Sequence, residues 1–207
     1  RSSEGQVAPQ LVVDVSPIQV DAEVMGRHLF YNNSTFDGNN PAANPADDGA
    51  LATDKQPLFA GQQATFANYS SFVHGVNGIF VDIANLAKPT QLSAADFAFR
   101  VGNSNNLDDW TPATAPQITV RQGAGENGSD RVSIIWPDGS IVGKWVEVTV
   151  LDNENTGLPQ QDVFYFGNAV GESGNSADDT VVNLSDSLGV RGNLADPVGI
   201  ANPHDFN

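Results

Sequence analysis

The chain has no cysteine among its 207 residues, and its histidines number three. Without cysteine there are no disulfide bonds and no thiolate chemistry. No apolar run approaches the roughly 20 residues that a membrane-spanning helix needs. The first residue is Arg1 rather than methionine, which predicts a piece processed from a longer product.

Positive charge is also scarce. Nine lysines and arginines stand against 25 aspartates and glutamates, which gives a net charge of −16. From Asp152 to Asn207 nine acidic residues accompany a single base, Arg191. This balance argues against nucleic acid or an anionic membrane surface as a partner, and it favours metal cations. We therefore expect an acidic, soluble exterior, no nucleic-acid partner and no membrane span.

Apolar residues make up 40% of the chain, which is enough for a globular core. Val146, Val148 and Val150 alternate with Glu147 and Thr149, a pattern typical of a half-buried strand. Similar short runs recur between Gly and Pro turns. They predict strands at 11–20, 24–31, 63–69, 78–83, 97–101, 117–121, 132–136, 144–151 and 163–166.

This succession of short strands predicts an all-β fold, a β-sandwich of the jelly-roll or Greek-key type. Helix is predicted only around residues 92–96 and after Asn183. We divide the chain into an N-terminal arm with a first strand, a β-sandwich domain and a C-terminal tail. Their predicted ranges are 1–20, 21–166 and 167–207.

The most specific motif opens this tail. The stretch from 162 to 186, DVFYFGNAVGESGNSADDTVVNLSD, passes from an alternating strand into a loop rich in side-chain oxygens. Calcium takes about six to eight oxygen ligands, some of them backbone carbonyls, with a carboxylate closing the loop. Calcium is therefore the predicted cofactor. The candidate ligands are Asn168, Glu172, Asn175, Asp179, Asp186 and the carbonyl group of Val181.

The segment VVNLSDSLGV, residues 181–190, resembles the second half of a dockerin-type repeat, an EF-hand-like calcium loop with its following helix. Residues 205–207 (DFN) resemble the opening of a second such loop, truncated at the end of the chain. The segments GRHLFYNNSTFDGNN, NGIFVDIA, DFAFRVGN and DVFYFGNAVGE resemble a module that precedes dockerin-like tails in large secreted bacterial proteins. These resemblances imply an extracellular or cell-surface location. They imply no activity, because that module has no assigned function.

The resemblance places Val181 at the carbonyl-donating position of the loop and Asp186 at the closing carboxylate. Counting back, Asn175 is the first ligand and Asp179 the fifth.

This register departs from the family pattern at Ala177, where an oxygen ligand is usual, and at Thr180, where the sharp turn calls for glycine. In a second register the loop opens at Asn168, has Glu172 as its fifth ligand and carries an insertion after it. Both registers stay open, as does a simpler interpretation in which these side chains supply only turns and a helix cap.

A second acidic loop spans residues 32–54. Loops of this length inside a compact domain often carry function or a bound ion. Asp37, Asp47, Asp48 and Asp54 are candidates for a second calcium site. No fixed spacing distinguishes that site from a solvated acidic loop.

No enzyme motif is present. The chain lacks a Gly-x-Ser-x-Gly elbow, a phosphate-binding loop and a dinucleotide fingerprint. His28, His74 and His204 do not have the i, i+4 spacing of a zinc site. Adjacent acids on loops are usually solvated, whereas a glycosidase pair faces one cleft from separate elements. The sequence predicts a protein that is not an enzyme.

Trp110 lies in the polar stretch NSNNLDDWTP and is the candidate ligand-binding aromatic residue. An exposed ring with polar neighbours can stack on a sugar, but packing against the fold is the simpler role for a single tryptophan in a loop. Trp136 and Trp145 fall within predicted strands, which favours packing in the core or at a sheet edge.

Two functions follow. The first is a structural, self-assembling subunit of the filament or surface-layer type, stabilised by calcium. Its β-prone N-terminal arm would add as a strand to the sheet edge of another copy, and the C-terminal tail would contribute to the same contact. The alternative is a carbohydrate-binding module of a secreted polysaccharide-active protein, with polysaccharide as its partner.

Overall fold

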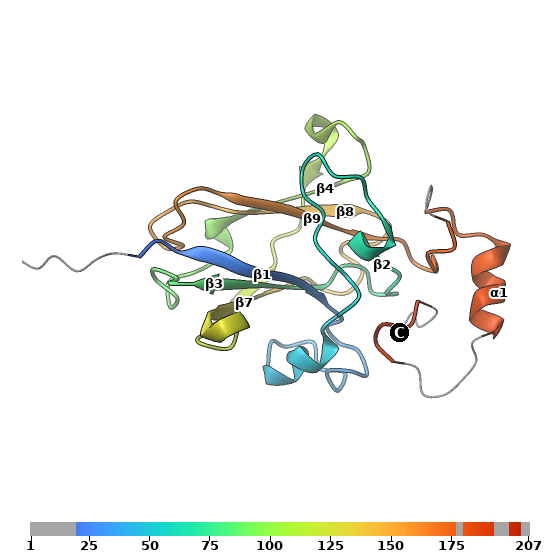
Figure 1. Ribbon diagram of the computed structural model, residues 1–207, viewed down its shortest axis with the longest axis horizontal. Helices are drawn as coiled ribbons and strands as arrows, with labels where there is room; N and C mark the ends of the chain where they lie inside the picture. Colours follow the sequence, from blue (N-terminus) through green and yellow to red (C-terminus); the bar gives the residue numbers. More distant parts are fainter. Residues whose placement is uncertain (1–19, 177–179, 193–198, 204–207) are drawn as a thin grey trace, which may run out of the picture.

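The computed structural model describes residues 20–176, 180–192 and 199–203 (Figure 1). The predicted N-terminal strand at 11–19, the predicted ligand Asp179 and the predicted second loop at 205–207 lie outside these residues. The described part is built from two sheets, one α-helix and short 3-10 turns. The prediction of an all-β sandwich is confirmed at this level.

The first sheet is antiparallel and has the strand order β1-β3-β7-β6. Its strands are β1 (Glu23–Phe30), β3 (Gly78–Ala84), β6 (Gln117–Arg121) and β7 (Asp130–Ile135). The second sheet has the order β2-β9-β8-β4-β5, with β2 and β9 parallel and the other pairs antiparallel. Its strands are β2 (Tyr69–Ser70), β4 (Phe97–Gly102), β5 (Thr111–Pro112), β8 (Trp145–Val150) and β9 (Asp162–Asn168).

Most predicted strands agree with the structure to within two residues, but the strand predicted at 63–69 is wrong. The side chain of Asn68 accepts hydrogen bonds from the backbone N–H and the hydroxyl group of Thr65. These bonds wind the chain into the 3-10 turn η2 (Phe66–Asn68) and leave only the two-residue β2. The predicted helix at 92–96 is likewise a single 3-10 turn, η3 (Ala94–Asp96).

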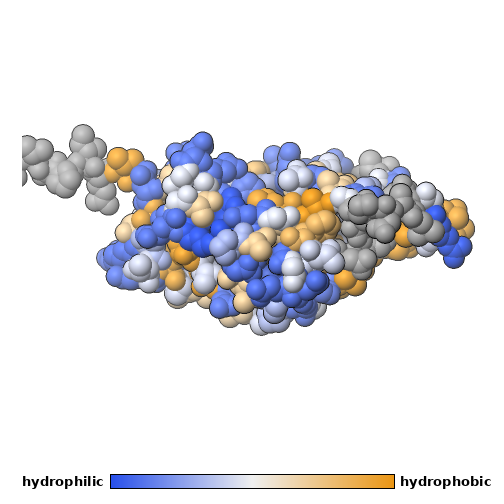
Figure 2. All heavy atoms as spheres, turned by 90° about the horizontal axis from the view of Figure 1, so that it is seen from below, coloured by the Kyte–Doolittle hydropathy of each residue, from blue (hydrophilic) through white to orange (hydrophobic). Residues whose placement is uncertain are grey.

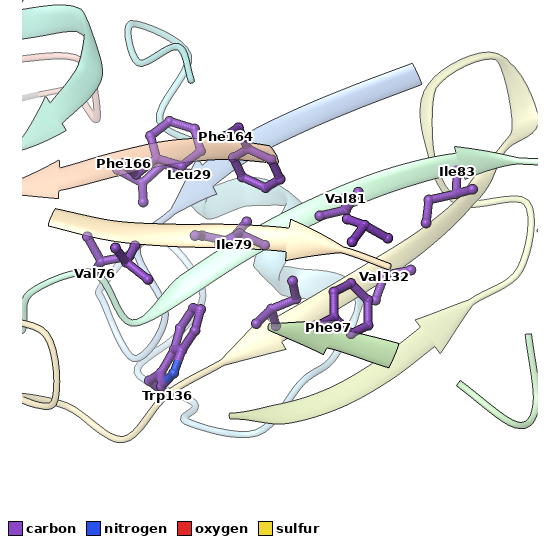
Figure 3. Close-up of a cluster of buried hydrophobic side chains, with 14 of the residues drawn as sticks. Leu29, Val76, Ile79, Val81, Ile83, Phe97, Val132, Trp136, Phe164 and Phe166 are labelled. Carbon is purple, nitrogen blue, oxygen red and sulfur yellow. The ribbon is translucent and has the colours of Figure 1, made fainter. Parts of the chain in front are cut away.

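The apolar core lies between the two sheets (Figure 3). The alternating pattern in β8 reports burial as predicted, because Val146, Val148 and Val150 are fully buried. Phe164 and Phe166 of β9 also face the core and are fully buried. Each such side chain stabilises the fold by about 1.5–3 kcal/mol relative to exposure. The two sheets therefore behave as one packed body.

Two of the three tryptophans show how the strand ends are fixed. Trp136, directly after β7, is fully buried, and its indole N–H donates to the carbonyl group of Thr114 at 2.8 Å. Its predicted packing role is confirmed. Trp145 opens β8 on the opposite face of the sheet from Val146 and is half-buried.

The loop 32–54 covers the outer face of the first sheet and contains the 3-10 turn η1 (Pro45–Ala50) (Figure 1). Under it, the rings of Phe30 and Phe80 stack with their centroids 4.0 Å apart. Gly78 makes room for this stack, because a Cβ atom there would lie 2.7 Å from the Phe30 ring. This long acidic loop is therefore a structural cover for an apolar cluster.

The tail lies at the end of the sandwich where β2 and β9 end (Figure 1). Its helix α1 (Leu184–Gly192) begins after Asn183, whose side chain accepts from the Ser185 N–H at 2.8 Å. The predicted helix after Asn183 is thus confirmed. Figure 2 shows a largely hydrophilic face on which apolar surface gathers toward the end that carries α1. No helix in the described segments is long and apolar enough to cross a membrane.

Candidate functional site

Two acidic side chains are buried together where the tail leaves the sandwich. Glu172, in the turn after β9, has 0% of its surface exposed, and Asp186, in the first turn of α1, has 1%. One oxygen of Asp186, Oδ1, accepts from both the backbone N–H and the hydroxyl group of Ser173, at 3.0 and 2.8 Å. The other, Oδ2, accepts from the Asn183 N–H at 2.8 Å. Asp186 therefore joins the loop to the helix.

The pKa values of these two carboxyl groups are shifted in opposite directions. Burial raises the pKa of Glu172, and the charge of Asp186 adds to this, while N–H groups of Gly174 and Asn175 oppose it. Burial would also raise the pKa of Asp186, but its hydrogen bonds from Asn183 and Ser173 outweigh burial and lower the pKa to about 2. The site thus holds one firmly ionised carboxylate beside a carboxyl group that favours a proton or a cation.

One oxygen of Glu172 has no partner. Its Oε1 accepts from the Gly174 N–H at 2.9 Å, but its Oε2 is buried and receives no hydrogen bond from the described residues. A buried acceptor without a partner costs about 1–3 kcal/mol. A proton shared with Asp186, which lies within hydrogen-bonding reach, would remove this cost. A hard cation bound by carboxylate oxygens would remove it as well.

Two other predicted ligands lie close to this pair. The backbone N–H of Asn175 bonds to Glu172, and its side chain bonds to Asp186. The carbonyl group of Val181 accepts from the side-chain amide of Asn183 at 3.0 Å. Glu172, Asn175, Val181 and Asp186 thus supply carboxylate, amide and carbonyl oxygens within one short stretch of the tail, although hydrogen bonds already occupy both oxygens of Asp186 and the carbonyl group of Val181. The hydrogen bond from the Asn183 N–H to Asp186 favours the simpler interpretation, in which these side chains only cap the helix.

Asn168, also a predicted ligand, has a different environment. Its amide nitrogen contacts the carbonyl groups of Ser70 and Phe72 at 3.2 and 2.9 Å, and its amide oxygen accepts from the Gly143 N–H at 3.0 Å. These bonds fasten the end of β9 to neighbouring segments of the sandwich. We therefore leave Asn168 out of the proposed ligand set.

The first two acids of the loop 32–54 organise its backbone. Asp37 is buried and accepts from the N–H groups of Asn33 and Ser34, at 2.6 and 3.0 Å. Asp47 is fully buried and accepts from the N–H of Asn44 at 2.9 Å, which caps η1. Burial raises the pKa of Asp47. Both carboxylates are used in local turns.

The other two acids of this loop form ion pairs. Asp48 lies 2.5 Å from Arg121 and 2.8 Å from Arg131. Although burial acts in the opposite direction, these arginines lower the pKa of Asp48. Asp54 pairs with the buried Lys55 at 2.9 Å. Asp37, Asp47 and Asp48 use both carboxylate oxygens in hydrogen bonds or ion pairs, and only Asp54 keeps a buried oxygen without a partner among the described residues. Because this loop offers no group of free oxygens in the described residues, we do not carry the second calcium site forward.

A cluster that the sequence did not reveal joins His28 of β1, Asp82 of β3 and Glu126 of η5 (Glu126–Gly128). The Nε2 atom of His28 lies 3.6 Å from Asp82 and 3.2 Å from Glu126. Both oxygens of Asp82 also accept from Arg131, at 2.8 and 2.7 Å. This cation already neutralises the buried carboxylate, so the cluster is an ion-pair network. Chain spacing cannot predict it, because its members come from three distant elements.

Trp110 lies in a groove on the outer face of the second sheet. Its indole N–H donates to the Ser104 carbonyl at 2.8 Å, and its ring meets Tyr165 edge to face with centroids 5.9 Å apart. The groove has a volume of about 440 Å³ and also includes Phe59 and Trp145. Trp110 therefore has a packing role and, at the same time, lines an open surface.

Comparison with protein-family models, curated proteins and solved structures finds no match of any of these kinds. The geometry of the chain's own residues therefore carries the functional argument.

Proposed function

We propose that the chain is a non-enzymatic, calcium-stabilised structural module of an extracellular protein, in which calcium holds the tail against the β-sandwich. The observation that carries this proposal is the buried Oε2 atom of Glu172, which has no hydrogen-bond donor among the described residues and lies beside the ionised Asp186. Two adjacent carboxylates repel each other unless a proton or a cation lies between them.

The composition supports calcium as that cation. The chain has no cysteine to cross-link its tail and carries a net charge of −16, so it attracts divalent cations. Carboxylate, amide and backbone carbonyl oxygens are the ligands that calcium prefers. A ligand that binds only the folded state stabilises that state. Calcium would thus replace a covalent link at the junction of sandwich and tail.

Calcium binding is directly measurable by isothermal titration of the metal-free protein. We expect binding that weakens by about tenfold or more, a loss of about 1.4 kcal/mol, in the Glu172→Gln and Asp186→Asn variants. A crystal grown with calcium should show an ion about 2.3–2.6 Å from oxygens of both residues. Asp108→Asn is the matched control, because Asp108 is exposed in the 3-10 turn η4 (Leu107–Asp109). Equal binding by all four proteins would remove the proposal.

The proposal includes self-assembly as the use of this module. The strand β1 lies at an edge of the first sheet, where its outer side forms only the isolated bridge Phe30–Leu51 among the described residues. An unpaired strand edge accepts an added strand from another chain. The β-prone segment 11–15 could supply that strand, and a head-to-tail contact of this kind generates filaments.

Assembly is testable by light scattering and electron microscopy at high protein concentration with calcium present. We expect particles larger than a monomer for the full chain and a monomer after deletion of residues 1–16. The deletion removes no described residue of the sandwich, so its folding serves as the control. A full-length protein that stays monomeric under these conditions would contradict the assembly part and leave the calcium part standing.

A further inference from the structure

The groove on the outer face of the second sheet brings together aromatic rings from four separate segments. Phe59 comes from the loop that arcs over β9 (Figure 1), Trp110 from the turn before β5, Trp145 from β8 and Tyr165 from β9. Phe59 has 36% of its surface exposed, and the Arg27 guanidinium lies 5.4 Å from the centre of its ring. The tertiary fold, and not local sequence, places these rings around one groove.

The polar residues of the groove carry no charge. Apart from the aromatic and aliphatic side chains, its described lining consists of two glutamines, two asparagines, one serine and one glycine. The chain as a whole has 25 acidic and nine basic residues, so an uncharged groove of about 440 Å³ stands out from its surroundings. The cation beside the groove, Arg27 over the Phe59 ring at 5.4 Å, is already paired with Asp162. The lining itself therefore offers no charged side chain to pair with a charged ligand, which favours a neutral one.

Two of the four amide side chains are free to bind a ligand. Gln62 accepts from the Phe59 N–H at 3.0 Å, and Asn103 donates to the Gly143 carbonyl at 2.9 Å, so both are used in shaping the groove. The side chains of Gln63 and Asn105 are exposed and form no hydrogen bond with the described residues. Each amide offers a carbonyl acceptor and two N–H donors.

We propose that this groove binds a neutral oligosaccharide. The C–H face of a pyranose ring is apolar and packs on aromatic rings such as Phe59 and Trp110, while its hydroxyl groups need donors and acceptors such as Gln63 and Asn105. An apolar platform with uncharged amides at its rim matches both requirements. This inference is independent of calcium, because none of the proposed calcium ligands lines the groove.

The test is titration calorimetry of the full chain with four uncharged hexasaccharides, namely cellohexaose, xylohexaose, laminarihexaose and mannohexaose. Oligogalacturonate serves as the charged comparison. We expect at least one neutral chain to bind, and we expect Phe59→Ala to weaken that binding by about tenfold, since one ring contact of about 1.4 kcal/mol is lost. The double variant Gln63→Ala/Asn105→Ala should weaken it to a similar extent.

The variants are chosen so that folding does not obscure the result. Trp110 packs on Tyr165 and lies over Gly102, so we expect its replacement to lower stability, whereas Phe59, Gln63 and Asn105 are exposed. Val73→Ala removes an exposed apolar side chain that does not line the groove and should leave binding unchanged.

Three results would overturn the inference. They are no binding of any neutral hexasaccharide, preferential binding of the charged one, or binding that is insensitive to the groove variants. A groove that instead contacts another copy of the chain would reveal itself if Phe59→Ala converts an oligomer to a monomer. Sugar binding that persists in chelator would separate this inference from the calcium proposal, and each can fail alone.

Discussion

Replacing Asp82 with alanine is expected to destabilise the sandwich by about 3–5 kcal/mol, because the buried cation of Arg131 loses its fully buried partner and retains the more exposed Asp48. Asp82 has 0% of its surface exposed and Arg131 has 7%. Burial opposes ionisation of Asp82, yet hydrogen bonds from Arg131 and the Glu126 N–H hold its pKa well below the usual range. Arg131 also packs over the Phe80 ring at 4.7 Å. One substitution therefore disturbs β3, β7 and the loop cover together.

Urea unfolding of three further variants would measure the contribution of the Asp82–Arg131 pair to the free energy of unfolding. Arg131→Met should be destabilising, but Asp82→Leu combined with Arg131→Met should recover much of the loss, because two apolar side chains leave no charge unpaired. The exposed pair of Lys88 and Glu154, 3.1 Å apart, is the matched control. Its Lys88→Ala variant should lose less than about 1 kcal/mol. A loss for Asp82→Ala as small as for Lys88→Ala would contradict the prediction.

The strands could be predicted where a local pattern reports burial. The alternation of Val146, Val148 and Val150 depends on which face of β8 meets the core, and all three are buried as expected. The strand prediction was wrong where side-chain hydrogen bonds set the conformation of the backbone. The side chain of Asn68 draws the chain into η2, and β5 pairs with β4 through only two residues of each strand. The order of the strands in each sheet could not be predicted from the sequence, because strand pairing depends on contacts between distant segments.

The candidate site could be predicted only in part for the same reason. Glu172 and Asp186 are close in sequence and close in space, so a motif could indicate them. Asn168 belongs to the same motif, but its amide bonds to Ser70, a residue 98 positions away. The groove around Trp110 is built from four separate segments, so the sequence could suggest one ring and not its neighbours.

Calcium is expected to reverse the pH dependence of tail stability. In chelator, the raised pKa of Glu172 means that ionising this residue destabilises the folded tail. Stability is therefore full below the ordinary value of 4.5 and is lost as the pH rises through the raised, folded pKa. Asp186 does not contribute to this change, because its pKa of about 2 keeps it ionised throughout. Its own contribution is lost only as the pH falls toward 2.

At the proposed site calcium would bind the ionised form of Glu172, so protons and calcium would compete. Calcium at about 100 times its dissociation constant should stabilise the tail by about 2.7 kcal/mol near neutral pH. This gain should shrink as the pH falls through the raised pKa of Glu172. Hydrogen exchange of the amides at 180–192 measures the opening of the tail apart from that of the sandwich. Magnesium at the same concentration is the control, since it prefers a smaller octahedral site.

The Glu172→Gln variant separates a metal site from a structural carboxyl group. Glutamine keeps the shape of the side chain and removes the titrating charge, so the tail should be more protected than wild type in chelator at neutral pH. Its protection should also be independent of pH between about 4.5 and 8, a window bounded below by the usual pKa of glutamate, and should not respond to calcium. If this variant and the wild type respond equally to calcium, the ion binds elsewhere and Glu172 serves only the packing of the tail.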